Sequence, residues 1–201
     1  MQRTVGQVGA KTWWRFAAFM SIAMALFSYR YLPRVGPLAP DIVANLFARP
    51  WLDLHVAGAA TALLLGSFQF IPALRRGGTH RWVGRAYVVS CLVGGIAGLP
   101  LAFGSTAGPI ATAGFGLLAV LWLATNILGW RAALRRDLIV HRRWMIRSWA
   151  LTLAAVTLRL YLVGAGVSGL PMAEAYRAIS FLCWVPNLIL AELYLRISRP
   201  A

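Results

Sequence analysis

Acidic side chains are scarce in this sequence. Only five of its 201 residues are Asp or Glu, against twenty Lys and Arg, and charged residues make up 12% of the chain. Soluble domains carry about 25% charged residues, so the composition excludes an ordinary soluble globular domain. The chain has two cysteines, Cys91 and Cys183, and they show no C-x-x-C spacing. A disulfide framework and a thiolate metal site are therefore excluded as well.

Recognised motifs of hydrolytic chemistry are also missing. The sequence contains no nucleophile–base pair, Walker loop, paired carboxylates or zinc signature, so hydrolysis is disfavoured. The net charge of +15 is typical of nucleic-acid binding when it occurs in a soluble protein. Here the arginines flank apolar runs and form no basic domain, so we expect them to meet lipid phosphates and not nucleic acid.

The sequence is rich in long apolar runs, and 60% of its residues are hydrophobic. A hydrocarbon core of roughly 30 Å takes about 20 helical residues, and six segments are long enough. The predicted spans are 13–33, 50–74, 82–103, 107–130, 144–166 and 175–197. We predict an all-α polytopic membrane protein with one domain, a bundle of six transmembrane helices whose second to fifth members form the core. The first run follows basic residues, as in a signal peptide, but lacks a small-x-small cleavage pattern, so we expect a retained helix.

Positive charge falls mostly on one side of this predicted bundle. With six spans, both termini share a side with the connectors after the second and fourth spans, and fifteen of the twenty Lys and Arg lie there, against four opposite. The fifteen are Arg3, Lys11, Arg15, Arg75, Arg76, Arg81, Arg85, Arg131, Arg135, Arg136, Arg142, Arg143, Arg147, Arg196 and Arg199. The positive-inside rule then places both termini in the cytoplasm, and we expect a multi-pass protein of the bacterial cytoplasmic (inner) membrane.

Small residues and one proline predict how the helices pack. Ser90, Gly94, Gly98 and Ala102 recur every four residues on one face of the third span, which lets another helix approach closely. Pro186 removes a backbone N–H in the sixth span and predicts a kink there. The short, uncharged connector 104–109 predicts a tight hairpin between the third and fourth spans.

Placing an ionisable side chain inside a bilayer costs free energy, and such side chains usually face the interior of the bundle. Those that share a depth could therefore contact one another. At 1.5 Å per residue, His55 lies roughly 8 Å and Arg159 about 10 Å below the outer ends of their helices. Asp53 lies two residues before His55, nearer the outer end of the same span, as a counter-charge. One interpretation is structural, with Arg159 held by Asp53 and helix carbonyls and His55 as a hydrogen-bonded neighbour. The other is an outer pocket that binds an anion or a quinone carbonyl.

A second polar layer is predicted near the cytoplasmic ends of the helices. Its members are Gln69, Arg85, Asn126, Arg147 and Glu192. A buried Glu192 requires a partner, and Arg147 and Arg85 are the available cations. We expect an ion pair that fixes the sixth span against the third or the fifth.

Two histidines stand where the third and fifth spans begin, in the similar strings 80–82 (HRW) and 141–144 (HRRW). Two imidazoles at one depth are the minimum needed to hold a haem iron axially. In that interpretation His80 and His141 ligate one haem b, and Arg81, Arg142 and Arg143 bind its propionates. In the alternative, both strings lie in interfacial loops that contact anionic lipid head groups.

Several strings of the chain resemble a bacterial family of uncharacterised membrane proteins, domain of unknown function 2306. They are 54–58 (LHVAG), 64–70 (LLGSFQF), 80–88 (HRWVGRAYV), 141–148 (HRRWMIRS) and 157–160 (TLRL), and the likeness covers about residues 15–197. The resemblance implies a membrane protein and assigns no activity. A looser similarity is to six-helix cytochromes of the b561 type, but the spaced histidine pairs with which those proteins hold two haems are missing here.

The sequence thus leaves two functional hypotheses. The first is a small membrane redox or quinone-interacting protein, with one haem b near the cytoplasmic face and a separate outer pocket at His55 and Arg159. The second is a non-enzymatic transporter or lipid-binding protein, in which the same His and Arg side chains bind phosphate head groups or a carried anion.

Overall fold

Every regular element in the described part of the chain is a helix. The computed structural model describes residues 2–36, 42, 44–71 and 78–198, with side chains in the first helix from Trp14 onward. The helices are α1 (Gln2–Tyr29), α3 (Ala48–Gln69), α4 (Gly78–Phe103), α5 (Pro109–Leu134), α6 (Leu138–Thr152), α7 (Ala154–Val167), α8 (Met172–Leu182) and α9 (Val185–Ile197). The predicted all-α membrane fold is confirmed.

Five stretches are long and apolar enough to cross a bilayer, and a shorter apolar helix, Trp14–Tyr29, lies within α1. The five are α3, α4, α5, the α6–α7 pair (Leu138–Val167) and the α8–α9 pair (Met172–Ile197). The fifth and sixth spans begin earlier than predicted, at residues 138 and 172. The predicted end of the second span at residue 74, together with Arg75, Arg76 and Arg199, lies outside the described residues, as do the side chains of Arg3 and Lys11.

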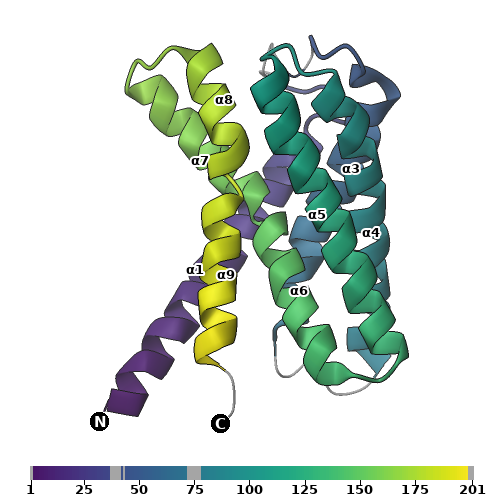
Figure 1. The fold of residues 1–201 in the computed structure, drawn as a ribbon, viewed down its shortest axis with the longest axis vertical. Helices are drawn as coiled ribbons and strands as arrows, with labels where there is room; N and C mark the ends of the chain where they lie inside the picture. Colours follow the sequence, from purple (N-terminus) through teal and green to yellow (C-terminus); the bar gives the residue numbers. More distant parts are fainter. Residues whose placement is uncertain (1, 37–41, 43, 72–77, 199–201) are drawn as a thin grey trace.

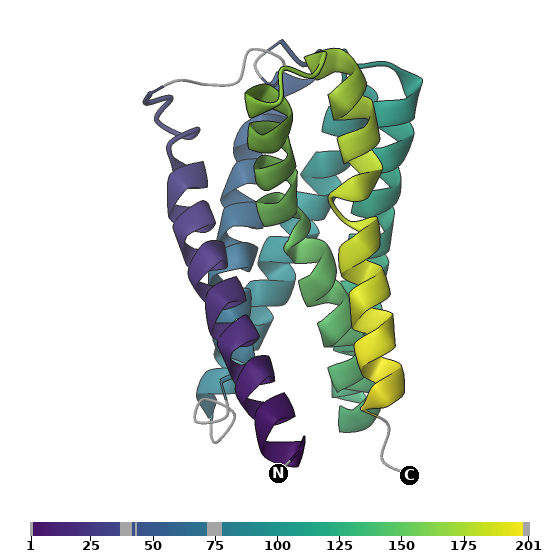
Figure 2. The same cartoon turned by 90° about the vertical axis from the view of Figure 1, so that its left-hand side faces the viewer.

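The helices run up and down, and both chain ends lie at the same end of the bundle (Figures 1 and 2). We call this the terminal end and the opposite one the far end. The helices α3, α4, α5 and α6 pack in sequence, α1 covers α3, and α9 covers α6. At the far end α8 packs against α5 and α7. The short connector between Phe103 and Pro109 forms the predicted tight hairpin of α4 and α5.

Glycines bring α3 and α4 into backbone contact. A Cβ atom on Gly58 would lie 2.5 Å from the backbone nitrogen of Gly94 and 2.7 Å from the carbonyl oxygen of Ser90. Gly98, one turn further along α4, faces the ring of His55, whose Nδ1 lies 3.2 Å from the position of an added Cβ. The small-residue face of the third span therefore packs against α3, since only small side chains allow so close an approach.

Two of the spans break at nearly the same depth. The sixth breaks between Leu182 and Val185, where Pro186 in the first turn of α9 cannot donate a backbone hydrogen bond. The fifth breaks at Leu153 without proline or glycine. Beyond the two breaks, α7 and α8 form a hairpin at the far end, which leans away from the line of α6 and α9 in Figure 1.

The side chain of Asn187 joins the two breaks. Its Nδ2 donates to the carbonyl oxygens of Ala150 (3.3 Å) and Cys183 (3.1 Å) and lies 3.2 Å from Thr157 Oγ1. The Thr157 hydroxyl donates in turn to the Cys183 carbonyl. Because a bilayer offers no partner to freed backbone groups, these bonds allow both helices to bend where they do.

Two contacts fix the α7–α8 hairpin against the rest of the bundle. Arg177 Nε donates to the Ala107 carbonyl at 2.9 Å. The rings of Phe115 and Tyr176 lie 5.3 Å apart between their centroids. These contacts join α8 to α5 and to the connector between α4 and α5 at the far end.

Candidate functional site

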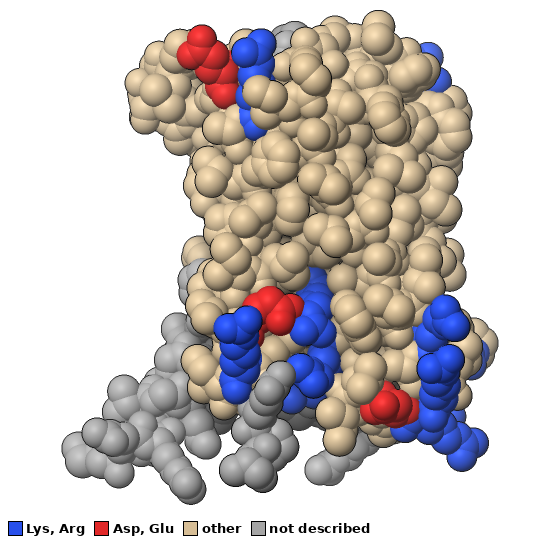
Figure 3. Space-filling model, viewed as in Figure 1, with Lys and Arg blue, Asp and Glu red and all other residues tan. Residues whose placement is uncertain are grey.

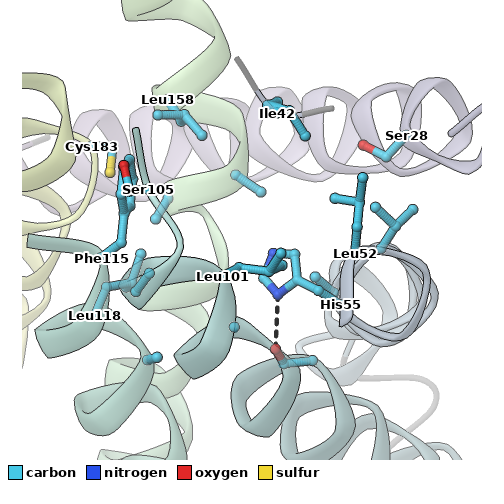
Figure 4. Close-up of a pocket in the computed structure, with 18 of the residues that line it drawn as sticks. Ser28, Ile42, Leu52, His55, Leu101, Ser105, Phe115, Leu118, Leu158 and Cys183 are labelled. Carbon is cyan, nitrogen blue, oxygen red and sulfur yellow. Dashed lines mark hydrogen bonds between the residues drawn. The ribbon is translucent and has the colours of Figure 1, made fainter. Parts of the chain in front are cut away.

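A cavity of about 430 Å³ occupies the far half of the bundle. Side chains from α1, α3, α4, α5, α6, α7 and α8 line it, and its walls are largely apolar (Figure 4). It extends from Ser105 and Met172 at the far end to Trp122 and Thr152 at mid-bundle. We call it the far-end cavity. Its size lies within the range of small-molecule pockets, roughly 300–1,000 Å³.

Arg159, on α7, lines this cavity. Among the described residues of the lining there is no other Arg and no Lys, Asp or Glu. Its Nη1 donates to the Ala155 carbonyl at 2.8 Å, one turn back along α7, and its Nη2 donates to Ser28 Oγ on α1 at 2.9 Å. Ser28 is 5% exposed, and its hydroxyl donates a hydrogen bond to the Met24 carbonyl at 2.7 Å. A guanidinium has five N–H donors, so these two bonds hold Arg159 in place while leaving donors for a bound molecule.

His55, on α3, lines the same cavity. Its Nδ1 lies 2.8 Å from the carbonyl oxygen of Gly94 on α4, and Figure 4 shows the ring beside Leu101 and Leu52. A carbonyl oxygen only accepts, so Nδ1–H is the donor in this bond. The bond fixes the orientation of the ring, and the close approach of α4 at Gly94 and Gly98 makes it possible.

The structure brings His55 and Arg159 to one cavity but gives Arg159 a different partner from the one expected. Asp53 does not neutralise Arg159: its carboxylate pairs at 3.6 Å with Arg34, and both of these side chains are more than 40% exposed. Arg159 is held by the neutral hydroxyl of Ser28 and by a helix carbonyl, that of Ala155. His55 and Arg159 both line the cavity, whereas Asp53 does not and pairs with Arg34.

Beneath the cavity lies a buried hydrogen-bonded cluster of Tyr87, Trp122, Ser148 and Thr152. Thr152 Oγ1 donates to the Ser148 carbonyl and accepts from Trp122 Nε1, both at 2.9 Å. The Tyr87 hydroxyl must therefore donate to Thr152 (2.9 Å), and it accepts from Ser148 Oγ at 2.7 Å. The cluster joins α4, α5 and α6, and Trp122 and Thr152 also form the inner end of the cavity.

This cluster was not among the candidates from the sequence. Uncharged hydroxyl and indole groups are common in membrane helices, so no single residue of the four signals a site. The one available signal was spacing, because Ser148 and Thr152 lie one turn apart on the same helix face.

In the polar layer at the terminal end, Arg147 pairs with Glu192. Arg147 Nε donates to Oε1 at 2.5 Å and its second donor, Nη2, reaches Oε2 at 3.0 Å, which joins α6 to α9. Arg85, the other cation considered, lies over the ring of Trp82 instead, 4.7 Å from its centroid. On the face drawn in Figure 3, Lys and Arg gather at this terminal end, below a band without charged side chains.

Gln69 belongs to the same end but lies apart from this ion pair. Its side-chain oxygen lies 3.4 Å from the position of a Cβ on Gly84 of α4. The residue ends α3 and packs against the start of α4.

The two histidines proposed as haem ligands lie near the starts of two different helices, α4 and α6. His80 is half-buried in the first turn of α4, which packs against α3 and α5, whereas His141 belongs to α6, which packs against α5 and α9. In Figure 2, α4 begins at the lower left and α6 at the lower right. His141 Nδ1 donates to the Gly129 carbonyl at 2.9 Å and so ties α6 to α5.

The arginines predicted to bind haem propionates are also spread over different surfaces. Arg81 is exposed on α4, Arg142 donates to the hydroxyl of Tyr194 at 3.2 Å, and Arg143 is half-buried on α6. A bis-histidine haem requires two imidazoles on opposite faces of one iron. The haem therefore stays a prediction from the sequence, and the described geometry gives it no support.

The chain belongs to a family of membrane proteins without an assigned activity. Residues 52–195 match the family model described as "Predicted membrane protein (DUF2306)". No curated protein and no solved structure matches the chain. The matched segment begins within α3 and ends within α9, so it contains His55, Arg159, the buried cluster and the Arg147–Glu192 pair.

The Arg147–Glu192 pair is predicted to stabilise the bundle through its coupling. Arg147→Gln and Glu192→Gln should each lower the stability in detergent, and the double variant should lose less than the sum. Each single change leaves a partly buried charge without its partner. We expect a coupling energy of about 1 kcal/mol, measured by denaturant unfolding in a double-mutant cycle.

The Arg34–Asp53 pair provides the matched control. Both of its side chains are more than 40% exposed, against 17% for Arg147, so the cycle of Arg34→Gln and Asp53→Asn should give a coupling of only a few tenths of a kcal/mol. Additive effects at Arg147 and Glu192 would show that the inner pair stabilises no more than a surface pair does.

Proposed function

We propose that this protein binds a quinone, or a lipid-soluble ring compound of similar chemistry, in the far-end cavity. The observation that carries the proposal is Arg159. Its guanidinium is fixed on two sides by Ser28 and Ala155, faces an apolar cavity, and has no carboxylate partner among the described residues. An ionisable group inside the membrane is costly and usually marks a functional site. A polarised carbonyl oxygen is the kind of group that such a cation would bind.

The walls of the cavity support a ring-shaped, mostly apolar ligand. Phe115, Leu118 and Leu158 contribute apolar surface on the side of α5 and α7, while His55 and Ser28 lie on the opposite side (Figure 4). Binding pockets of this kind combine a hydrophobic lining with a few fixed polar groups that orient the ligand. When bound, a quinone would supply redox chemistry, and the residues described here would bind and orient its ring.

The terminal end supports a second proposal, which concerns orientation. Arginines from α4, α5, α6 and α9 gather there, as Figure 3 shows for one face. We infer that this end faces the cytoplasm in the bacterial cytoplasmic (inner) membrane, where its arginines contact anionic lipid head groups. The far-end cavity would then lie in the outer half of the bilayer.

Quinone binding is tested by titrating decylubiquinone into the detergent-purified protein. Trp122 lines the cavity, so the ligand should quench part of the tryptophan fluorescence and raise the unfolding temperature. Arg159→Gln should weaken binding at least about tenfold, since a hydrogen bond to a charged group is lost. Arg34→Gln, an exposed arginine outside the cavity, should leave the affinity unchanged.

A second pair of variants separates binding from folding. Leu158→Trp fills the cavity without removing a hydrogen bond, whereas Leu160→Trp, on the same helix, adds a ring to a side chain that is 50% exposed. We expect the first variant to abolish quinone binding and the second to retain it. Equal binding by both would exclude the far-end cavity as the site, and competition by a fatty acid would indicate an anion site instead.

Reporter fusions test the orientation. A C-terminal green fluorescent protein should be fluorescent and a C-terminal alkaline phosphatase inactive, because both ends of the chain lie at the basic end (Figure 1). An active phosphatase fusion would reverse the proposed orientation.

A further inference from the structure

The hydrogen bond of His55 determines what its ring offers to the cavity. Nδ1 donates to the Gly94 carbonyl at 2.8 Å, so this nitrogen carries a hydrogen. In a neutral imidazole one nitrogen is a donor and the other an acceptor. The second nitrogen, Nε2, is then an acceptor.

Figure 4 shows which way this acceptor faces. The bonded nitrogen points to the carbonyl on α4, and the other ring nitrogen points away from it, toward the open centre of the cavity. The lining includes Arg159 but no Asp or Glu among the described residues. A protonated ring would add a second positive charge with nothing to compensate it, which is costly in an apolar site. The cavity therefore holds a neutral His55 whose acceptor is directed at the ligand.

His55 and Arg159 thus offer opposite hydrogen-bonding functions. The guanidinium only donates, and two of its donors are already bonded to Ser28 and Ala155. The imidazole nitrogen that faces the cavity only accepts. A molecule that satisfies both groups must carry an O–H or N–H donor together with an oxygen acceptor.

We propose that the far-end cavity selects the reduced form of its ring ligand, the quinol, over the quinone. This inference rests on the proposed function. The quinol hydroxyl donates to His55 Nε2, and a ring oxygen accepts from Arg159. A quinone has only carbonyl acceptors, which leaves the histidine acceptor unpaired inside the membrane and cannot bond to it.

The size of the preference for the quinol over the quinone depends on the cost of leaving His55 Nε2 unpaired. A buried acceptor that loses its partner costs its full desolvation penalty. This penalty is larger than the net contribution of a typical hydrogen bond to binding. A site that is built to bond a ligand hydroxyl discriminates strongly against analogues that lack it. We expect the quinol to bind about tenfold more tightly than the quinone.

The experiment compares three probes on the full-length protein in detergent. They are decylubiquinol kept reduced without oxygen, decylubiquinone, and the dimethyl ether of the quinol, which keeps the ring oxygens but cannot donate. The wild type should bind the quinol about tenfold more tightly than either of the others. The ether excludes an effect of redox state alone, because it is reduced yet lacks the hydroxyl.

Two substitutions at one position identify the acceptor. His55→Asn keeps a donor near the place of Nδ1 for the Gly94 carbonyl but puts nothing at the place of Nε2. It should bind decylubiquinol and decylubiquinone with similar affinity, because the acceptor that distinguishes them is removed. His55→Gln reaches the place of Nε2 with an amide oxygen and should restore part of that preference.

The outcomes separate this inference from the proposed function. Equal affinity of the wild type for quinol and quinone would overturn the selectivity and leave quinone binding intact. Binding of none of the three probes would overturn both proposals. An unchanged preference for the quinol in His55→Asn, with the unfolding temperature retained, would overturn the assignment of His55 as the acceptor of the hydroxyl hydrogen bond.

Discussion

The side-chain amide of Asn187 is the interaction on which the shape of this protein depends. It donates to the carbonyls of Ala150 and Cys183 and contacts Thr157, where two membrane-spanning helices break side by side. Lipid cannot replace these bonds, since hydrocarbon offers no partner to a freed carbonyl. Because both spans bend at one depth, their outer parts form the α7–α8 hairpin. That hairpin closes one side of the far-end cavity and carries Arg159 to it.

Polar groups are fully paired in the buried cluster but only partly paired around the cavity. Tyr87, Ser148, Thr152 and Trp122 bond to one another in a closed arrangement that fixes α4, α5 and α6. Such fully paired groups rigidify a core. Around the cavity, polar atoms are held in position on one side and directed at open space on the other, as in the imidazole of His55. This contrast separates a group that supports the fold from one that is available to a ligand.

Composition and charge were enough to predict the apolar helical spans and the shared side of the chain ends, because a bilayer leaves few alternatives to apolar helices with basic flanks. Proline chemistry predicted the break at Pro186. The break at Leu153 could not be predicted, since no proline or glycine is present there and it depends on contacts with the next span. Depth along a helix brought His55 and Arg159 to one level. Rotation about the helix axis, which decides that Asp53 pairs with Arg34, depends on how whole helices pack.

Photoaffinity labelling with an azidoquinone tests the central claim most directly, because it locates the ligand without assuming which residues bind it. Binding in the far-end cavity predicts adducts on peptides from α3, α7 and α8 that line it. Excess unlabelled decylubiquinol should reduce these adducts, and Leu158→Trp should abolish them. Adducts confined to the terminal end of the bundle, or labelling that the competitor does not reduce, would contradict the account.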